Sequence, residues 1–477
     1  MTSATTPLAP TTPAATVTTR RPRGRRNTEA LLLVAGYGLC LLAFAQVALV
    51  LDGRLTTAFA VFAVVLAGCV LVAHLAVRRL AASADPVLLP TITVLNGLGL
   101  AMIYRLDRAD GRTGLSAASD FSAQLGWTVL GVALFVAVLA LVREPRLLQR
   151  YTYTAGFIGL ALLILPLIPG LGVEINGARI WVRLPVGADS LSFQPGELAK
   201  LFLIVFFTGY LVEKRDVLAL ARTRVLGIDV PRGRDLGPIV VAWLASLGVL
   251  VFERDLGTSL LFFGVFVAML YIATERWSWL VIGSVLFVAG SALAYALFPH
   301  VQTRFSVWLN PFADEAGSGY QIAQSLYGFA TGGILGTGLG QGFPDFVPYA
   351  STDFIAAAFG EELGLAGFMA IMVLYAIVVE RGFRTSLAAR DSFGKLLAAG
   401  LSIEVGLQVF VVVGGVTRLI PLTGLTTPFL SYGGSSLIAN WMLIALLMRI
   451  SDHARRGVVA PGGPPARSTS SEPAVTR

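Results

Sequence analysis

Charged side chains are scarce in this chain of 477 residues. Only 13% of the residues are Asp, Glu, Lys or Arg, whereas 55% are hydrophobic, and the mean hydropathy is +0.75. Soluble domains carry about a quarter charged residues, so the composition excludes a water-soluble globule. Apolar runs long enough to cross a bilayer take the place of the missing charge.

Cysteine and histidine are also rare. The two cysteines, Cys40 and Cys69, both lie inside apolar runs, which excludes a disulfide framework and a zinc site. The three histidines are too far apart along the predicted topology to form a metal site, and whether a divalent cation is required stays open. The net charge of +8 comes from arginines scattered between apolar runs, so we expect contacts with membrane lipids and no nucleic acid.

Both ends of the sequence lack apolar runs. Residues 1–28 are rich in Thr, Pro, Ala and Arg, and residues 451–477 are similar. We therefore expect two disordered cytoplasmic tails and no cleavable signal peptide.

Apolar runs fill the sequence between the tails, and each approaches the roughly 20 residues that a helix needs to span hydrocarbon. They lie at 30–51, 55–77, 86–104, 123–142, 151–170, 198–212, 236–252, 256–273, 277–298, 353–379, 394–413 and 427–448. The predicted fold class is all-α, a polytopic membrane protein with about 12 transmembrane helices.

The distribution of positive charge predicts an orientation, because Lys and Arg are enriched in the cytoplasmic loops of membrane proteins. If the N-terminal tail is inside, most of the 36 basic residues fall in cytoplasmic segments. We therefore predict a multi-pass protein of the cytoplasmic membrane with both termini inside. The longest outside segments are then 171–197 and 299–352. Long loops are usually functional, so we expect the chemistry on this extracellular face.

Ionisable residues within or at the ends of spans are costly in a membrane and are functional candidates by default. They are Glu197, Lys200, Asp255, Asp353, Glu361, Glu362 and Glu404. Glu197 and Lys200 are three residues apart and share one helix face. Two interpretations remain open for them: a mutually neutralising structural pair, or a cation aimed at an anionic substrate, with Glu197 fixing it.

Two other segments also allow more than one interpretation. Glu253, Arg254 and Asp255 interrupt two apolar runs, either as a solvated turn or as a charged site. The segment 328–342 contains seven glycines and superficially resembles a nucleotide-binding loop. No strand–turn–helix unit surrounds it, so a flexible, close-packed entrance loop is the better interpretation.

Motifs on the predicted outer face, taken in order, resemble those of the SEDS family (shape, elongation, division and sporulation). They are Asn176–Trp181, Gln194–Lys200, Asp255–Thr258, Trp308–Asp314 with Gly319–Ser325, Thr352–Ile355, Gly360–Gly364 and Pro421–Ser436. One such motif is a weak signal, whereas the whole set in the right order is a strong one.

The resemblance covers roughly residues 86–450, a membrane core of ten spans, and leaves 29–85 as two additional N-terminal spans. In this respect the chain is more similar to the actinobacterial form of the RodA type, the elongation branch, than to the FtsW type, the division branch. The sequence departs from the family pattern at Ser351, where many members have His, and at Glu315, where Pro often follows the loop Asp.

The resemblance implies a peptidoglycan glycosyltransferase that transfers lipid II disaccharide-peptide units onto a growing glycan strand for cell elongation and shape. It implies a class B penicillin-binding protein as the partner that cross-links the strands. The family's required acid corresponds to Asp314, for which we expect the role of catalytic base. As substrate-binding residues we expect Arg179 and Lys200, as cations for the pyrophosphate, together with Glu197, Asp255, Asp353 and Glu361.

Two alternatives of other classes remain. A protein with a dozen spans and intramembrane charges could carry lipid II across the bilayer, although its charges cluster on one face. A non-catalytic scaffold of the wall-synthesis complex would leave Asp314 dispensable.

Overall fold

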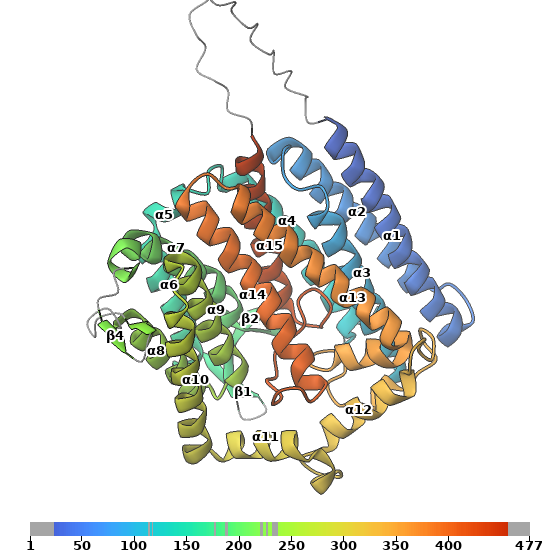
Figure 1. Cartoon of the computed structure of the whole chain (residues 1–477). Helices are drawn as coiled ribbons and strands as arrows, with labels where there is room; N and C mark the ends of the chain where they lie inside the picture. The colour runs from blue at the N-terminus through green and yellow to red at the C-terminus, as the bar shows by residue number, and fades with distance from the viewer. Residues whose placement is uncertain are drawn as a thin grey trace, which may run out of the picture.

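The computed structural model describes residues 23–112, 115–116, 118–175, 178–186, 189–219, 223–225, 228–230 and 237–456. Most of each predicted tail lies outside these ranges, as do Asn176 and Gly177 of the first motif. Residues 23–28 and 451–455, which we expected to be disordered, are helical because the first and last long helices extend into them. In the described part, long helices run side by side, and several of the short helices and strands lie at one end of the bundle (Figure 1).

Each predicted span corresponds to a helix. Among the described residues, ten helices are long and apolar enough to cross a membrane: α1 (Arg23–Asp52), α2 (Thr57–Leu80), α3 (Leu88–Ala109), α4 (Asp120–Leu141), α7 (Pro195–Ala219), α9 (Leu256–Thr274), α10 (Ser278–Leu297), α13 (Ile355–Ala388), α14 (Ser392–Val416) and α15 (Gly434–Arg455). The remaining two are α6 (Thr152–Ile164) and α8 (Gly237–Glu253). The prediction of an all-α membrane protein is confirmed.

The helix α6 is shorter than its predicted span. It passes into the 3₁₀ helix η1 (Leu165–Leu167), which contains Pro166. Proline lacks the N–H that would continue an α-helix, which accounts for the early end.

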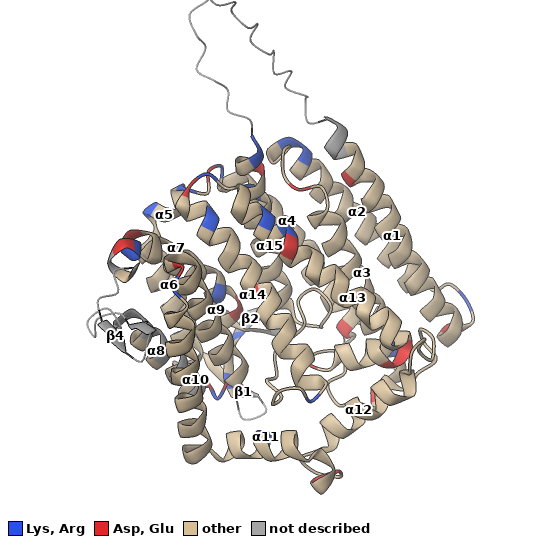
Figure 2. Cartoon of the chain, in the orientation of Figure 1, with Lys and Arg blue, Asp and Glu red and all other residues tan. Residues whose placement is uncertain are grey.

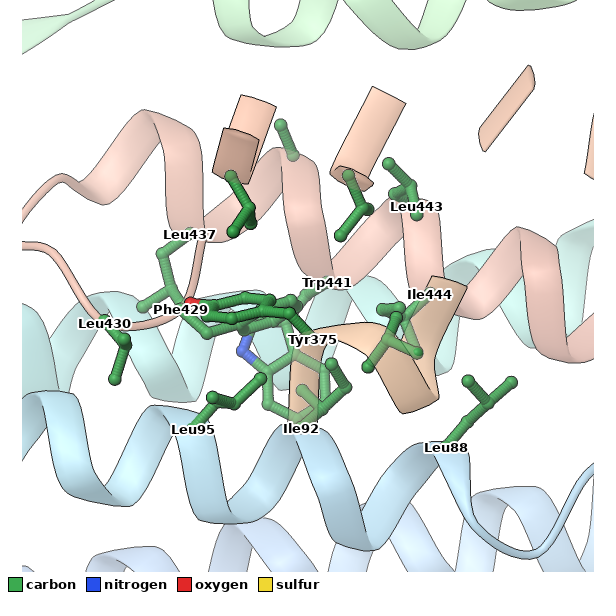
Figure 3. Close-up of a cluster of buried hydrophobic side chains, with 14 of the residues drawn as sticks. Leu88, Ile92, Leu95, Tyr375, Phe429, Leu430, Leu437, Trp441, Leu443 and Ile444 are labelled. Atoms are coloured by element: carbon green, nitrogen blue, oxygen red, sulfur yellow. The ribbon is translucent and has the colours of Figure 1, made fainter. Parts of the chain in front are cut away.

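The helices α3 and α15 form the centre of the bundle. Both are buried along almost their whole length, whereas α10 lies at the periphery. Figure 3 shows Ile92 of α3 close to Trp441 of α15 in the apolar core. A Cβ atom at Gly99 would lie 2.5 Å from the carbonyl oxygen of Leu430. The absence of a side chain at Gly99 therefore lets the turn that precedes α15 pack directly against α3.

The predicted outer segments contain regular structure that the sequence analysis did not predict. Residues 171–197 include an antiparallel sheet in the order β1-β2-β3, and residues 299–352 include four short helices or 3₁₀ turns. These elements are β1 (Gly172–Ile175), β2 (Ala178–Val186), β3 (Asp189–Phe193), α11 (Pro299–Leu309), η3 (Pro311–Asp314), α12 (Tyr320–Gly332) and η4 (Pro344–Phe346). We call the end of the bundle that carries α11 and α12 the loop face.

The opposite end, which we call the tail face, carries the start of α1 and the end of α15 (Figure 1). It also carries the short helix α5 (Leu147–Arg150) and many of the Lys and Arg residues visible in Figure 2. Several of these bases are paired: Arg455 lies 2.5 Å from Asp85, and Arg456 lies 2.6 Å from Asp452. A small hairpin of β4 (Thr223–Val225) and β5 (Ile228–Val230) follows α7.

Candidate active site

Asp314 is the last residue of η3, between α11 and α12 on the loop face. One of its carboxylate oxygens accepts hydrogen bonds from the backbone N–H of Ser318 at 2.8 Å and from the Ser318 hydroxyl at 3.0 Å. These donors stabilise the charged form and hold the pKa of Asp314 below its ordinary value. The side chain is exposed, so Asp314 is an ionised and accessible carboxylate at neutral pH.

Ser318 also connects Asp314 to a cavity of about 150 Å³ on the loop face. The walls come from α11, from the start of α12 and from the chain after α14. Two guanidinium groups line the cavity, those of Arg304 and Arg418, together with Gln321 and Trp308. Two cations therefore line one cavity, and the carboxylate of Asp314 lies next to it through Ser318. The sequence did not predict a site role for either arginine.

Arg418 joins the turn after α14 to the end of α11. Its Nε donates to the carbonyl oxygen of Trp308 at 2.8 Å, and its Nη2 donates to that of Leu309 at 2.7 Å. In return, the indole N–H of Trp308 donates to the carbonyl oxygen of Arg418 at 3.2 Å. These bonds use neutral acceptors, so the positive charge of Arg418 stays at the cavity wall.

Arg304 is held by the same stretch of chain. Its Nη1 donates to the carbonyl oxygens of Leu422 and Thr423 at 2.9 and 3.0 Å. A Cβ atom at Gly424 would lie 3.8 Å from Nη2 of Arg304 and 3.7 Å from Oδ2 of Asp353. The guanidinium of Arg304 and the carboxylate of Asp353 therefore both lie next to the backbone of Gly424.

Two carboxylates act electrostatically on Arg304. Burial raises the pKa of Asp353 to about 6, an effect that the charge of Arg304 opposes. Burial lowers the pKa of Arg304, while Asp255 and Asp353 oppose that change. The sequence candidates Asp255 and Asp353 thus come together around a residue that was not among the candidates.

Asp255 is the N-cap of α9. Its carboxylate accepts the backbone N–H of Thr258 at 2.9 Å and the Thr258 hydroxyl at 2.6 Å, which satisfies donors at the start of the helix. Asp255 and Glu253 are both buried. The solvated-turn interpretation is therefore wrong for these two carboxyl groups.

Lys200 lies in a buried ionic network between α7 and α14. Its Nζ is 2.9 Å from Glu197 and 2.9 Å from Glu404, and it donates to Oε1 of Gln408 at 2.7 Å. Lys200 and both carboxylates are buried. This arrangement favours the mutually neutralising pair, enlarged by Glu404, over a cation that faces an anionic substrate.

Glu361 lies away from the cavity. It is buried near the start of α13, where its Oε1 accepts the backbone N–H of Phe343 at 2.7 Å. A Cβ atom at Gly328 would lie 3.2 Å from its Oε2. Glu361 therefore packs against the glycine-rich segment, in keeping with the predicted close packing of that segment.

Arg179 is an exposed residue of β2. Neither it nor Lys200 nor Glu361 is among the described residues that line the cavity. Within the described ranges, no group of three or more His, Cys, Asp or Glu side chains is arranged to hold a metal ion.

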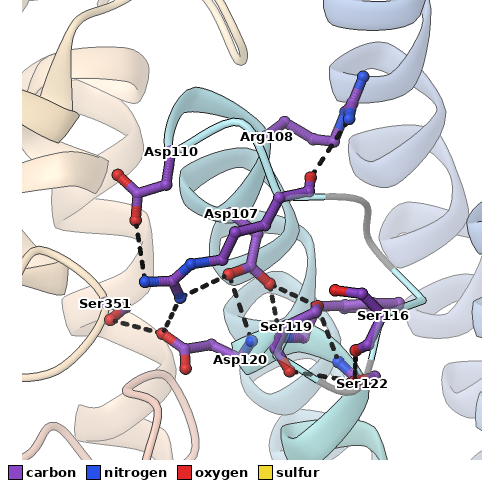
Figure 4. Close-up of polar contacts among 10 residues, drawn as sticks. Asp107, Arg108, Asp110, Ser116, Ser119, Asp120, Ser122 and Ser351 are labelled. Carbon is purple, nitrogen blue, oxygen red and sulfur yellow. Dashed lines mark hydrogen bonds and ion pairs between the residues drawn. The ribbon is translucent and has the colours of Figure 1, made fainter.

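Ser351, the position where the resemblance expects His, lies two residues before Asp353. Figure 4 shows its hydroxyl directed at Asp120, to which it donates at 3.4 Å. Asp120 is paired at 3.4 Å with Arg112, which also lies 3.3 Å from Asp107. The carbonyl oxygen of Ser351 accepts the Tyr432 N–H at 2.7 Å. The serine thus helps to hold the segment that carries Asp353.

One feature of the sequence could have identified Arg304 as a site residue, namely the lack of other basic residues around it. It is the single base between 299 and 352, a segment that contains several acids. Arg418 lies in the outer segment between two predicted spans, where few bases occur. The sequence predicted an outer position for both arginines but gave no sign that they line one cavity.

Comparisons with known proteins agree with this architecture. The model of the FtsW, RodA and SpoVE family, described as cell cycle protein, matches residues 86–456. The chain is 56% identical over 385 residues to the peptidoglycan glycosyltransferase RodA of Mycobacterium tuberculosis, covering 80% of this chain and 81% of that protein. It is 49% identical over 444 residues to RodA of Mycobacterium leprae, covering 93% and 94%.

A solved structure is also similar. One chain of a peptidoglycan synthase complex that coordinates polymerization and crosslinking aligns with a TM-score of 0.61 and 26% identity, over 79% of this chain and 99% of that chain. The family match covers most of the sequence and starts after α2. The protein therefore belongs to the FtsW, RodA and SpoVE family of membrane-embedded cell cycle proteins.

Proposed function

We propose that this protein is a peptidoglycan glycosyltransferase of the RodA type, which polymerises lipid II at the outer face of the cytoplasmic membrane during cell elongation. The observation that carries the proposal is the position of Asp314 beside a cavity on the loop face that Arg304 and Arg418 line, since Ser318, which donates to Asp314, is also a lining residue. The mycobacterial relatives named peptidoglycan glycosyltransferase RodA support it.

The reaction needs a base. A sugar hydroxyl of one substrate attacks the anomeric carbon of the other, so a new carbon–oxygen bond forms and the bond to the pyrophosphate oxygen breaks. The polyprenyl pyrophosphate leaves with the electron pair, and the hydroxyl proton must be accepted. Asp314 is the proposed acceptor, because it is exposed, ionised and adjacent to the cavity.

The reaction also needs cations, because negative charge grows on the departing pyrophosphate. Arg304 and Arg418 line the cavity and are the proposed contacts. Arg179 stays a proposed contact from β2, where it is exposed. Asp255 and Asp353 flank Arg304, and we propose that they orient its guanidinium. For Glu197, Lys200 and Glu361, the buried contacts support a role in holding the helices.

The proposed orientation has the loop face outside and both tails in the cytoplasm. The lipid tail of the substrate then lies in the bilayer, while its sugar head reaches the cavity. The concentration of Lys and Arg toward the tail face supports this orientation.

The proposed partner is a class B penicillin-binding protein, which would cross-link the new strand. The similar solved chain belongs to a complex that coordinates polymerization and crosslinking, which supports such a pairing here.

The test is polymerisation by the purified full-length protein, together with a class B penicillin-binding protein and labelled lipid II, scored for glycan chains on gels. Glycan chains that disappear when Asp314 is replaced by Asn are the expected result. If no glycan forms but lipid II moves between the leaflets of proteoliposomes, the protein is a transporter. If neither occurs, a scaffold role replaces the enzyme.

A further inference from the structure

The outer end of α3 contains a buried arginine that the proposed reaction does not use. Arg105 is only 3% exposed. Its Nε donates to Glu362 at 2.6 Å, its Nη1 donates to Asp345 at 2.9 Å, and its Nη2 donates to the carbonyl oxygen of Gly342. A buried guanidinium is costly without partners, so its burial requires these acceptors to stay in place.

The acceptors lie on two parts of the chain, the segment 336–346 and the start of α13. The segment has little regular structure, so its backbone groups need partners outside it. Four of its N–H groups bond to Glu361 and Glu362: Thr337 at 3.0 Å, Gly338 at 2.9 Å, Gly340 at 2.9 Å and Phe343 at 2.7 Å. Arg105 joins the two parts directly, because it donates both to the segment 336–346 and to Glu362 of α13.

Asp353 lies between the two parts that Arg105 joins. The segment 336–346 leads through the turns at 347–352 to Asp353, and α13 begins two residues later. The position of Asp353 beside Arg304 therefore depends on how the segment 336–346 lies against α13.

The contacts around Arg105, which we call the Arg105 clamp, extend to α1, the first of the two additional N-terminal helices. Tyr104, next to Arg105 on α3, donates to Asp52 at the end of α1 at 2.8 Å, and Arg108 pairs with the same carboxylate. A Cβ atom at Gly340 would lie 3.3 Å from the side chain of Val50. The helix α1, which precedes the region matched by the family, thus packs against the segment that Arg105 holds.

We propose that Arg105 is a positioning residue of the polymerase: it holds the segment 336–346 against α13 and thereby places Asp353 beside Arg304. The inference rests on the proposed glycosyltransferase function. Arg105 acts through Asp345 and Glu362 rather than by contact with the substrate.

The activity test uses the full-length protein in nanodiscs with the penicillin-binding protein partner and lipid II. Arg105→Gln should lower kcat about 10- to 100-fold at nearly constant KM, the size expected for a misplaced site. Arg105→Lys should recover part of the loss, because it keeps the charge but not the planar fork. Asp345→Asn should lower kcat too, and the double variant Arg105→Gln with Asp345→Asn should fall no further than Arg105→Gln alone.

Arg449 provides the matched control, because it is also a buried arginine with an Asp partner, Asp452, but belongs to the last two turns of α15, the helix that ends at the tail face. Arg449→Gln should lower thermal stability while the folded protein keeps its kcat. If Arg105→Gln behaves in the same way, with kcat and KM of the folded protein unchanged, the positioning role is overturned.

A second readout separates this inference from the proposed function. In the described part of the chain the native cysteines, Cys40 and Cys69, are buried, so a cysteine introduced by Ser351→Cys can be labelled selectively. Its reaction with a maleimide should be several-fold faster when Arg105→Gln is added. An unchanged labelling rate would overturn the positioning role of Arg105, whatever the activity of the variant. A wild-type protein that makes no glycan would overturn only the glycosyltransferase proposal.

Discussion

Lys200 on α7 and Glu404 on α14 lie 2.9 Å apart, Nζ to Oε1, inside the bundle. Glu197 lies at the same distance from the ammonium, so two carboxylates share one cation. Gln408 completes the group and donates from its own amide to the carbonyl oxygen of Thr426 at 2.8 Å. The network therefore links two helices that are far apart in sequence.

Replacing Lys200 with Ala should destabilise the protein by about 3–5 kcal/mol, because it leaves two buried carboxylates without their cation. The surviving folded protein should keep its specific activity for lipid II. Thermal unfolding and polymerisation measured on the same preparation provide the check. The matched variant Arg179→Ala, at an exposed site, should keep its stability and lose turnover. A stable Lys200→Ala protein without turnover would restore the pyrophosphate role to this residue.

Asp314→Asn should reduce lipid II polymerisation by about 10² to 10⁴, the usual contribution of acid–base catalysis. The amide keeps the size of the side chain but cannot accept the proton, so folding and binding of the partner should survive. Initial rates of glycan formation measure the effect. Glu315→Gln is the control and should be much milder, because Glu315 bonds to the Tyr327 hydroxyl at 2.8 Å. A folded Asp314→Asn protein with wild-type rate would move the base elsewhere, with Asp353 as the next candidate.

Ser318→Ala should change the pH dependence of the reaction. The hydroxyl of Ser318 is one of the donors that hold the pKa of Asp314 below its ordinary value. Its removal should raise that pKa, so a larger share of Asp314 is protonated in mild acid and unable to act as a base. The acidic limb of the kcat/KM profile should therefore move to higher pH. If Asp314→Asn is inactive but this limb does not move, Asp314 has a role other than base.

Asp353 should make stability depend on pH. Its pKa is raised to about 6, above the value of about 3.9 in an unfolded chain. The folded state therefore binds the proton more tightly, and the resulting stabilisation is complete below about pH 4 and lost as pH rises through about 6. The unfolding midpoint of wild type should fall between about pH 4 and 7, and that of Asp353→Asn should fall less. Equal slopes for the two proteins would contradict this assignment.

Cysteine labelling should test the orientation. In intact cells an impermeant reagent should reach cysteines introduced at Gly317 and Asp189, on the predicted outer segments, and not those introduced at Arg224 or Arg384. The expectation follows from the excess of Lys and Arg in the segments predicted to be cytoplasmic. Reaction of Arg224→Cys from outside would reverse the proposed orientation.

The amino-acid sequence by itself determined where the helices lie. Spanning a bilayer requires a local run of apolar residues, and such a run predicted a helix at each position. Several helix ends differ from the prediction: α6 ends early, before Pro166, α13 continues to Ala388, and α15 begins at Gly434 instead of 427. The order of the outer motifs also determined the family and singled out Asp314, because a motif is a property of neighbouring residues. Both are local, so they needed no knowledge of the packing.

Only the tertiary structure decided which charges meet. Lys200 and Glu197 are one helical turn apart, yet the partner Glu404 lies on another helix. In the same way, Arg304 donates to the carbonyl oxygen of Thr423, and Arg105 donates to Asp345. These partners are far apart in the sequence and meet only because the helices pack together. The physical reason is that the orientation of each helix about its axis depends on all the helices that pack against it. A buried charge pairs with the opposite charge that this packing places next to it.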